Sequence, residues 1–330
     1  MPFYKFNWDL LELKYSMYIN NRTSYIFILL IIPVFSYAES NLSNVCKEFR
    51  SIPEKNVEYI TRNYSNIYKK GLLWKIESPE GKFNYLFGTM HSQDYTVTKL
   101  SPEVQLALRQ SKTLILETIP NQKAYQSFID MMYFKDGEKL NDMLEIEFFN
   151  ELKNLIKDYG IEQKKLEYIK PWAAFSLVGR PKPTRAPNLE DNLLNFSKQH
   201  KLTIESLESM EEILSALDSL LIEDQLIILK DTICNHAKIM RETITLVELY
   251  VNRDLAGILA FNNQPHHDEA VFERFMQNIL YDRNKKMLQR IEIAFKSGNV
   301  FVAVGASHLT DEKGLLQSLS KKGYRVTPIY

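Results

Sequence analysis

Two histidines follow the same local pattern in distant parts of the chain, and their residue type and spacing suit a reactive site. His91 stands three residues after Gly88, and His308 stands three residues after Gly305. Imidazole nitrogens bind zinc and similar ions, and they also exchange protons near neutral pH. The paired G-x-x-H motifs therefore predict one site with metal-dependent or acid–base chemistry.

Each motif follows an apolar run that favours a buried β-strand. The runs are residues 83–87 and 300–304, and both are rich in β-branched or aromatic side chains. A glycine after a strand permits a sharp turn or a close approach, because it has no Cβ. Ligands of open α/β sheets bind beyond the carboxyl ends of the strands, which is where both histidines are expected. The alternative for each histidine is a structural residue that is hydrogen-bonded beside a turn.

Glu117 is the third candidate, because it ends another apolar run. Residues 101–103 supply an N-cap, a proline and an acid for a helix through residues 104–110. The run at 113–116 then predicts a strand parallel to the first motif strand. Glu117 is therefore expected at the same sheet edge as His91.

The other elements follow from periodicity and turn residues. Residues 72–77 predict a strand that forms a hairpin with the first motif strand through the turn at 78–81. Helical spacing extends over about 123–170 and 210–296. The remaining expectations are a helical lead-in at 39–70, an irregular surface loop at 171–187, a helix at 190–199, a strand at 202–208 ending in Glu208, a helix at 314–322 and a strand at 324–329.

Composition indicates an ordinary globular protein. The 330 residues include 41 basic and 41 acidic side chains, so no nucleic-acid partner is expected. Hydrophobic residues make up 45% of the chain, which is enough for a sizeable core. The two cysteines, Cys46 and Cys234, lack metal-site spacing, and whether they form a disulfide is left open.

The N-terminus has the features of a signal peptide over residues 1–38. Lys14 and Arg22 precede an apolar run at 25–35, and Ser-Tyr-Ala at 36–38 supplies a cleavage site. The expected mature domain is therefore exported to a periplasmic or extracellular location and has no stable membrane span. The run is shorter than the ~20 residues of a membrane helix, and a retained anchor is the alternative.

The chain resembles the TraB/GumN family, which also takes in the Tiki metalloproteases. The resemblance extends from about residue 70 onward and rests on both G-x-x-H motifs with the intervening order preserved. Its carriers are residues 71–76, 86–91, Glu117, 170–172, 207–208, 283–284, Met287, 302–309 and 323–324. The resemblance implies an α/β (α+β) fold in which two β/α halves form a mixed central sheet, with a large helical insertion at about 121–295.

The resemblance also implies a metal site formed by His91, Glu117 and His308. Two imidazoles and a carboxylate suit manganese, cobalt or zinc and leave positions open for water. Metal-bound water loses a proton more easily, and Glu208 is a candidate general base. Arg283 is the remaining candidate, to hold a substrate carboxylate or to orient Glu117. Glu117, Glu208 and Arg283 are thus the expected catalytic residues.

Several residues have plainer interpretations. Glu208 lies in an acidic run that suits a solvated face, and Arg283 stands beside Asp282, with which it could form a surface ion pair. The adjacent pair His266-His267 is a poor chelate for one ion. The family usually has Gly-Leu-Asp where this chain has Asn-Leu-Glu at 188–190, so a role for Glu190 is left open.

The expected function is an exported, metal-dependent hydrolase that acts on an amide or peptide bond. One alternative is a non-catalytic protein that binds or sequesters a peptide or small molecule in the same cleft. The other is a metal-free hydrolase in which a histidine is the general base.

Overall fold

The structure is a computed structural model that describes residues 42–50, 68–119 and 121–330. The predicted signal peptide and residues 51–67 of the predicted lead-in lie outside these ranges. The lead-in contributes helix α2 (Lys47–Arg50). In the described ranges, none of the helices combines the length and the apolar character that a membrane crossing requires.

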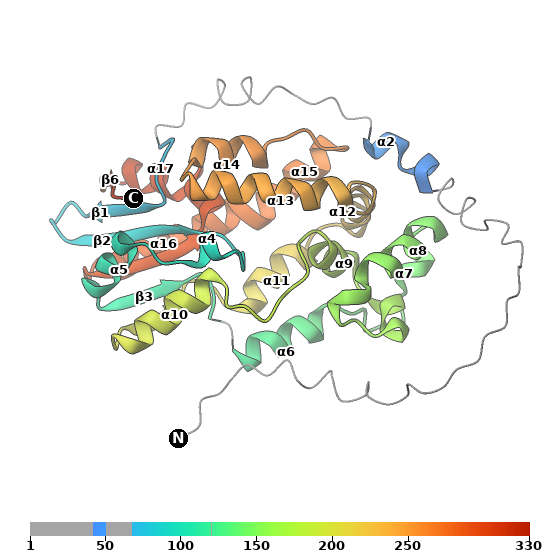
Figure 1. Ribbon diagram of the computed structural model, residues 1–330, viewed down its shortest axis with the longest axis horizontal. Helices are drawn as coiled ribbons and strands as arrows, with labels where there is room; N and C mark the ends of the chain where they lie inside the picture. The colour runs from blue at the N-terminus through green and yellow to red at the C-terminus, as the bar shows by residue number, and fades with distance from the viewer. Residues whose placement is uncertain (1–41, 51–67, 120) are drawn as a thin grey trace, which may run out of the picture.

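Six strands form one mixed sheet, as predicted, in the order β4-β3-β5-β2-β1-β6 (Figure 1). The strands are β1 (Leu73–Glu77), β2 (Phe83–Thr89), β3 (Thr113–Leu116), β4 (Thr203–Ser206), β5 (Val300–Gly305) and β6 (Arg325–Pro328). Strand β1 is antiparallel to both β2 and β6. Strands β2, β5, β3 and β4 are parallel, so their carboxyl ends share one edge.

Strand register places the two G-x-x-H motifs side by side. Gly88 pairs with Val304 and Thr89 pairs with Gly305 in the parallel ladder of β2 and β5. Strand β5 also pairs with β3, where Leu116 lies opposite Ala303. Residues that follow these three strands therefore gather at one place, although they come from distant parts of the chain.

Helices on the sheet share a buried apolar cluster with the strands. These helices are α4 (Tyr95–Thr98), α5 (Pro102–Arg109), α10 (Leu189–Gln199), α13 (His236–Val251), α14 (Leu255–Asn262), α16 (Asp282–Phe295) and α17 (Leu315–Lys321). Leu108, Leu193, Met287 and Leu315 each expose 0% of their surface in this cluster, whose burial stabilises each such side chain by about 1.5–3 kcal/mol. The predicted N-cap of α5 is confirmed, because the Ser101 hydroxyl accepts a hydrogen bond from the Val104 N–H at 3.3 Å.

A second apolar cluster lies beside the sheet and is built almost entirely from helices (Figure 1). Its helices are α2, α6 (Gln122–Met131), α7 (Leu140–Met143), α8 (Ile146–Leu155), α9 (Pro171–Val178), α11 (Met210–Asp218) and α12 (Ile222–Cys234). Two further segments, α15 (Glu269–Met276) and the π-helix η4 (Gln277–Tyr281), connect this cluster to α16. The predicted helical insertion is thus divided, because part of it has its own core while β4, α10, α13, α14 and α16 within it join the sheet.

A disulfide between Cys46 and Cys234 attaches α2 to the end of α12. The surrounding contacts are specific, because Arg50 Nε donates to the Cys234 carbonyl oxygen at 3.0 Å and Asn235 Nδ2 donates to the Phe49 carbonyl oxygen at 3.0 Å. The pairing that the sequence left open is therefore present.

The prediction of an irregular loop over residues 171–187 is wrong in its first half. Residues Pro171–Val178 form helix α9, and Trp172, Ala173 and Ala174 are fully buried. Proline at the first helical position begins this helix rather than breaking it. An apolar surface all round the helix leaves no period of 3.6 residues to detect. Residues 180–187 are exposed and irregular, as predicted.

Candidate functional site

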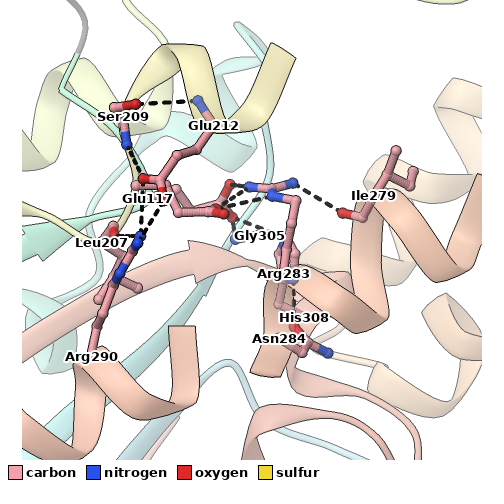
Figure 2. A network of polar contacts seen from close by, with 11 residues as sticks. Glu117, Leu207, Ser209, Glu212, Ile279, Arg283, Asn284, Arg290, Gly305 and His308 are labelled. Carbon is pink, nitrogen blue, oxygen red and sulfur yellow. Dashed lines mark hydrogen bonds and ion pairs between the residues drawn. The ribbon is translucent and has the colours of Figure 1, made fainter. Parts of the chain in front are cut away.

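The sequence candidates converge at the carboxyl edge of the parallel strands. His91 follows β2 by two residues, Glu117 directly follows β3, and Glu208 follows β4 by two. His308 lies in a short 3-10 helix, η5 (Ala306–Leu309), directly after β5. Arg283 reaches the same place from α16 (Figure 2).

Glycine is required in both motifs for close packing rather than for an unusual backbone angle. A Cβ built on Gly305 would lie 3.2 Å from Glu117 Oε1 and 3.6 Å from a carbon of the His308 ring. A Cβ on Gly88 would lie 2.8 Å from a Leu309 methyl group. The absence of these two side chains lets Glu117 and η5 approach the strand ends.

Glu117 is a well-held carboxylate. Its Oε1 accepts a short hydrogen bond from the Gly305 N–H, and its Oε2 accepts one from Arg283 Nη2 at 3.0 Å. Burial opposes the charged form, but His308, which is protonated only at low pH, together with the charges of Arg283 and His91 outweighs this effect and holds the pKa of Glu117 at about 2. Glu117 is therefore ionised at every pH at which the protein would work.

Arg283 connects two carboxylates. Its Nη2 donates to Glu117 Oε2 and also to Glu208 Oε2, the latter at 2.8 Å, and its Nε donates to Glu208 Oε2 at 3.0 Å. Its Nη1 donates to the Ile279 carbonyl oxygen at 3.1 Å. Asp282 pairs instead with Lys285 at 2.8 Å, so the surface ion pair considered for Arg283 is absent from the structure. Figure 2 shows Arg283 between Glu117 and the Ile279 carbonyl group.

Glu208 is almost completely enclosed. Its side chain is 1% exposed. Burial raises the pKa of Glu208, and the Arg283 guanidinium offsets part of that rise. A carboxylate that solvent does not reach is better suited to fixing Arg283 than to accepting a proton from bulk water.

His308 is a buried, neutral imidazole. Its Nδ1 lies 2.6 Å from Asn284 Oδ1, while Asn284 Nδ2 donates to the Lys313 carbonyl oxygen at 3.1 Å. This network assigns the ring proton to Nδ1 and leaves a lone pair on Nε2. Burial lowers the pKa of His308 to about 4. The Nε2 atom lies 3.5 Å from Glu117 Oε1, so two acceptors face each other across a space that suits a proton or a cation.

His91 differs from His308 because its side chain is 73% exposed. Its Nδ1 lies 3.1 Å from Oε1 of Glu190, whose side chain is only 12% exposed. The Glu190 charge raises the pKa of His91, and the Glu117 charge adds to the rise. The Nε2 atom of His91 is the ring nitrogen left available to a ligand.

Two residues that the sequence did not select as site residues, Glu190 and Asn284, hold the two histidines. Glu190 is fixed in the first turn of α10 by a capping box, in which Asn188 Oδ1 accepts from the Asp191 N–H at 2.8 Å. Both carboxylate oxygens of Glu190 are buried, and within the described part of the chain the contact of Oε1 with His91 Nδ1 is an ion pair, with no regular hydrogen bond to either oxygen. For Glu190, the sequence signal of a role in the site was an acidic residue at a position where the family usually has aspartate. For Asn284 the available signal was its place, with Arg283, among the residues that carry the family resemblance.

The imidazole and carboxylate groups of His91, Glu117 and His308 are suitable metal ligands, although they do not converge on one point. Among residues 42–50, 68–119 and 121–330, no three His, Cys, Asp or Glu side chains converge closely enough to hold a metal. The histidines nevertheless share a feature of metal ligands, since each has Nδ1 against a side-chain oxygen and Nε2 uncommitted.

The other histidines in the described ranges lie elsewhere in the structure. The His266 ring stacks on Phe272 with centroids 3.4 Å apart, and the His267 ring lies 4.1 Å from that of Phe49. His200 stacks on Phe196 at 4.1 Å. These contacts agree with the interpretation of His266-His267 as an unsuitable chelating pair.

Comparison with known proteins gives one family. The model of the TraB/PrgY/gumN family matches residues 72–328, a span that includes all six strands and every site residue described above. No curated protein and no solved structure matches the chain.

Proposed function

The chain belongs to the TraB/PrgY/gumN family, and we propose that it is a metal-dependent hydrolase that cleaves an amide or peptide bond. The single observation that carries the proposal is the matched anchoring of two histidines. Asn284 holds Nδ1 of His308 and Glu190 holds Nδ1 of His91, while Glu117 lies 3.5 Å from Nε2 of His308. Oxygen partners on Nδ1 fix the ring orientation of metal-binding histidines in many proteins.

The residues that would hold the ion are His91, Glu117 and His308. A bound manganese, cobalt or zinc ion would supply Lewis acidity and an activated water. Arg283 and the Gly305 N–H keep the Glu117 carboxylate in place at the sheet edge. His91 must lose its proton to become a ligand, so ion binding by this site releases a proton.

We assign Glu208 to positioning rather than to proton transfer. Its 1% exposure and its two hydrogen bonds from Arg283 support this assignment. Arg283 in turn holds Glu117, so Glu208 acts on the reacting centre through the guanidinium. This assignment replaces the general-base role that the sequence suggested for Glu208.

A second candidate function is a hydrolase that needs no metal. The observation in its favour is the pair formed by exposed His91 and buried Glu190, which resembles the carboxylate–imidazole pairs of general acid–base catalysis. In this version Glu190 orients His91, and Nε2 of His91 exchanges the proton with the substrate or with water.

We also propose that the protein works in an oxidising, exported location. The Cys46–Cys234 disulfide supports this, because such bonds persist mainly in secreted and periplasmic proteins.

Metal content and peptide hydrolysis, measured together, test the proposal. The folded protein is exposed separately to manganese, cobalt and zinc, and bound metal is measured by mass spectrometry. His91→Ala and His308→Asn remove one proposed ligand each, and His200→Ala is the matched control outside the site. Near-stoichiometric metal, lost with hydrolysis in both site variants but retained in the control, supports the primary function. Hydrolysis that persists without metal supports the second candidate, and absence of hydrolysis with every metal contradicts both.

A further inference from the structure

A cavity of about 470 Å³ lies among the helices beside the sheet. Helices α9, α11, α12 and α15 form its walls, together with η4. Its apolar lining includes Phe175, Ile213, Leu217, Ile228, Val271 and Phe272. The volume falls within the ~300–1,000 Å³ of small-molecule pockets, and it is many times the roughly 30 Å³ of one water molecule.

The polar and charged groups of the lining are paired within the protein: Asp268 accepts a hydrogen bond from the Val271 N–H at 3.0 Å, and Arg283 pairs with two carboxylates. The Asp231 carboxylate accepts a hydrogen bond from Asn235 Nδ2 at 2.7 Å, and the Thr232 hydroxyl donates to the Ile228 carbonyl oxygen at 2.7 Å. The His266 ring stacks on Phe272, and burial lowers the pKa of His266 to about 4, so this ring is neutral. A cavity of this character favours an apolar group over a charged one.

The cavity meets the candidate site at Arg283, while His91, Glu117 and His308 lie outside its lining. Arg283 lines the cavity and also donates hydrogen bonds to Glu117 and Glu208. Ile279 lines the cavity too, and its carbonyl oxygen accepts from Arg283 Nη1. A molecule that fills the cavity would thus have its near end beside the guanidinium that holds Glu117.

We propose that this cavity is the specificity pocket of the site and receives an extended apolar group of the substrate. The group is a fatty acyl chain or a run of hydrophobic peptide side chains, which share the same chemistry. This inference rests on the proposed hydrolase function for the identity of the bound molecule as a substrate. The scissile bond would lie beyond Arg283, toward Glu117 and His308.

A series of N-acylglycines tests the acyl source, because each compound carries an apolar chain and one amide bond. Affinity is measured by calorimetry from the hexanoyl to the dodecanoyl compound, and release of glycine is measured in the same samples. Affinity should rise about fourfold for each added methylene, which corresponds to about 0.8 kcal/mol. A parallel series of tripeptide amides, from triglycine to trileucine, tests the peptide source.

Variants that fill the cavity locate the binding site. Ile228→Trp on α12 and Ile213→Trp on α11 place bulk in the lining, and neither residue belongs to the reactive site. Glu223→Trp and Ser215→Trp are the matched controls on exposed positions of the same two helices. Circular dichroism and thermal unfolding show which variants fold. If neither filled variant folds, the dependence of affinity on chain length in the parent protein tests the inference.

The outcomes separate this inference from the proposed function. Affinity that grows with chain length, and that falls at least tenfold in the filled variants but not in the controls, supports the pocket. The compound series whose affinity rises more steeply with the size of the apolar group shows whether the pocket receives an acyl chain or peptide side chains. Affinity that is independent of chain length, or unchanged in folded filled variants, overturns the inference even if amides are hydrolysed. Cavity binding with no hydrolysis of any compound supports the pocket and contradicts the hydrolase function.

Discussion

Glu190 Oε1 lies 3.1 Å from Nδ1 of His91, so a mostly buried carboxylate supports a histidine that is largely exposed to solvent. The two residues come from different elements, since His91 follows β2 and Glu190 lies in the first turn of α10. The pair gives the site one imidazole that favours its charged form. His308, a few residues from Gly305 on β5, favours its neutral form.

Glu190→Gln should lower the pKa of His91, because it removes the largest favourable charge on that ring while preserving side-chain size. Two-dimensional NMR of the metal-free protein measures the titration of His91 directly. Glu205→Gln, at an exposed position on β4, is the control and should leave the His91 titration unchanged. An unchanged His91 pKa in Glu190→Gln would contradict the ion pair.

The same ion pair predicts a sign for stability. His91 has a folded-state pKa above its unfolded value of 6.5, so the pair stabilises the fold below that pH. This contribution is lost as the pH rises through the folded-state pKa. The stability difference between the parent protein and Glu190→Gln should therefore shrink toward alkaline pH, as measured by urea unfolding.

Arg283→Met should destabilise the protein by about 3–5 kcal/mol, because it leaves the Glu117 and Glu208 carboxylates without their common partner. Arg283→Lys keeps one charge but loses the branched geometry, and should recover only part of the loss. Urea unfolding at neutral pH measures both. A double variant, Arg283→Met with Glu208→Gln, should be more stable than Arg283→Met alone. If Arg283→Met has the same free energy of unfolding as the parent protein, the contacts of Arg283 with Glu117 and Glu208 do not stabilise the fold.

His308 should make the metal-free protein sensitive to mild acid. The folded-state pKa of about 4 lies below the ordinary 6.5, so the unfolded chain binds the proton more readily. Stability should fall as the pH drops from about 6.5 to about 4, by roughly 3 kcal/mol at most. Glu117, whose pKa is held at about 2, acts in a lower window that begins near 4.5.

His308→Gln should flatten this pH dependence. The amide has no proton to gain in this range, although its loss of the Asn284 contact lowers stability at all pH values. Chemical unfolding between neutral pH and about pH 4, in the presence of a chelator, makes the comparison. An equal slope in parent and variant would show that His308 does not control acid sensitivity.

Loss of the disulfide should cost about 2–5 kcal/mol, because the bond joins residues separated by 188 positions in sequence. The double variant Cys46→Ala/Cys234→Ala should melt at a lower temperature than the parent protein in the absence of reductant. Addition of reductant should lower the parent to the level of the variant and leave the variant unchanged. A parent that melts at one temperature with or without reductant would argue against the bond.

Local chemistry was enough to predict the strands, the cap of α5 and the sheet edge at which His91, Glu117 and His308 gather. An apolar run that predicts a strand, or a Ser-Pro-Glu sequence that predicts a helix N-terminus, involves only a few neighbouring residues. Such patterns can therefore be recognised from the sequence alone. Helix α9 was missed because a helix that is apolar on every side has no periodic signal.

The partners of the site residues were harder to predict than their positions. That Arg283 would bridge Glu117 and Glu208, and that Asn284 would hold His308, depends on how α16 packs against β3, β4 and β5. Such packing joins segments that are distant in sequence: the separation is 24 residues for Asn284 and His308, 75 for Glu208 and Arg283, and 166 for Glu117 and Arg283. No local pattern specifies a contact of that range.

The place of β5 in the sheet also determines when the candidate site can form during synthesis of the chain. Strands β2 and β3 leave the ribosome long before β5, yet they do not pair with each other, since β5 lies between them. A nascent chain already holds His91 and Glu117 while the middle of its sheet is still missing. Pairings of such long sequence separation form slowly, and the exposed strand edges invite misassembly until they form. The reactive centre is thus completed late, when β5 enters the middle of the sheet and η5, directly after it, brings His308 to the site.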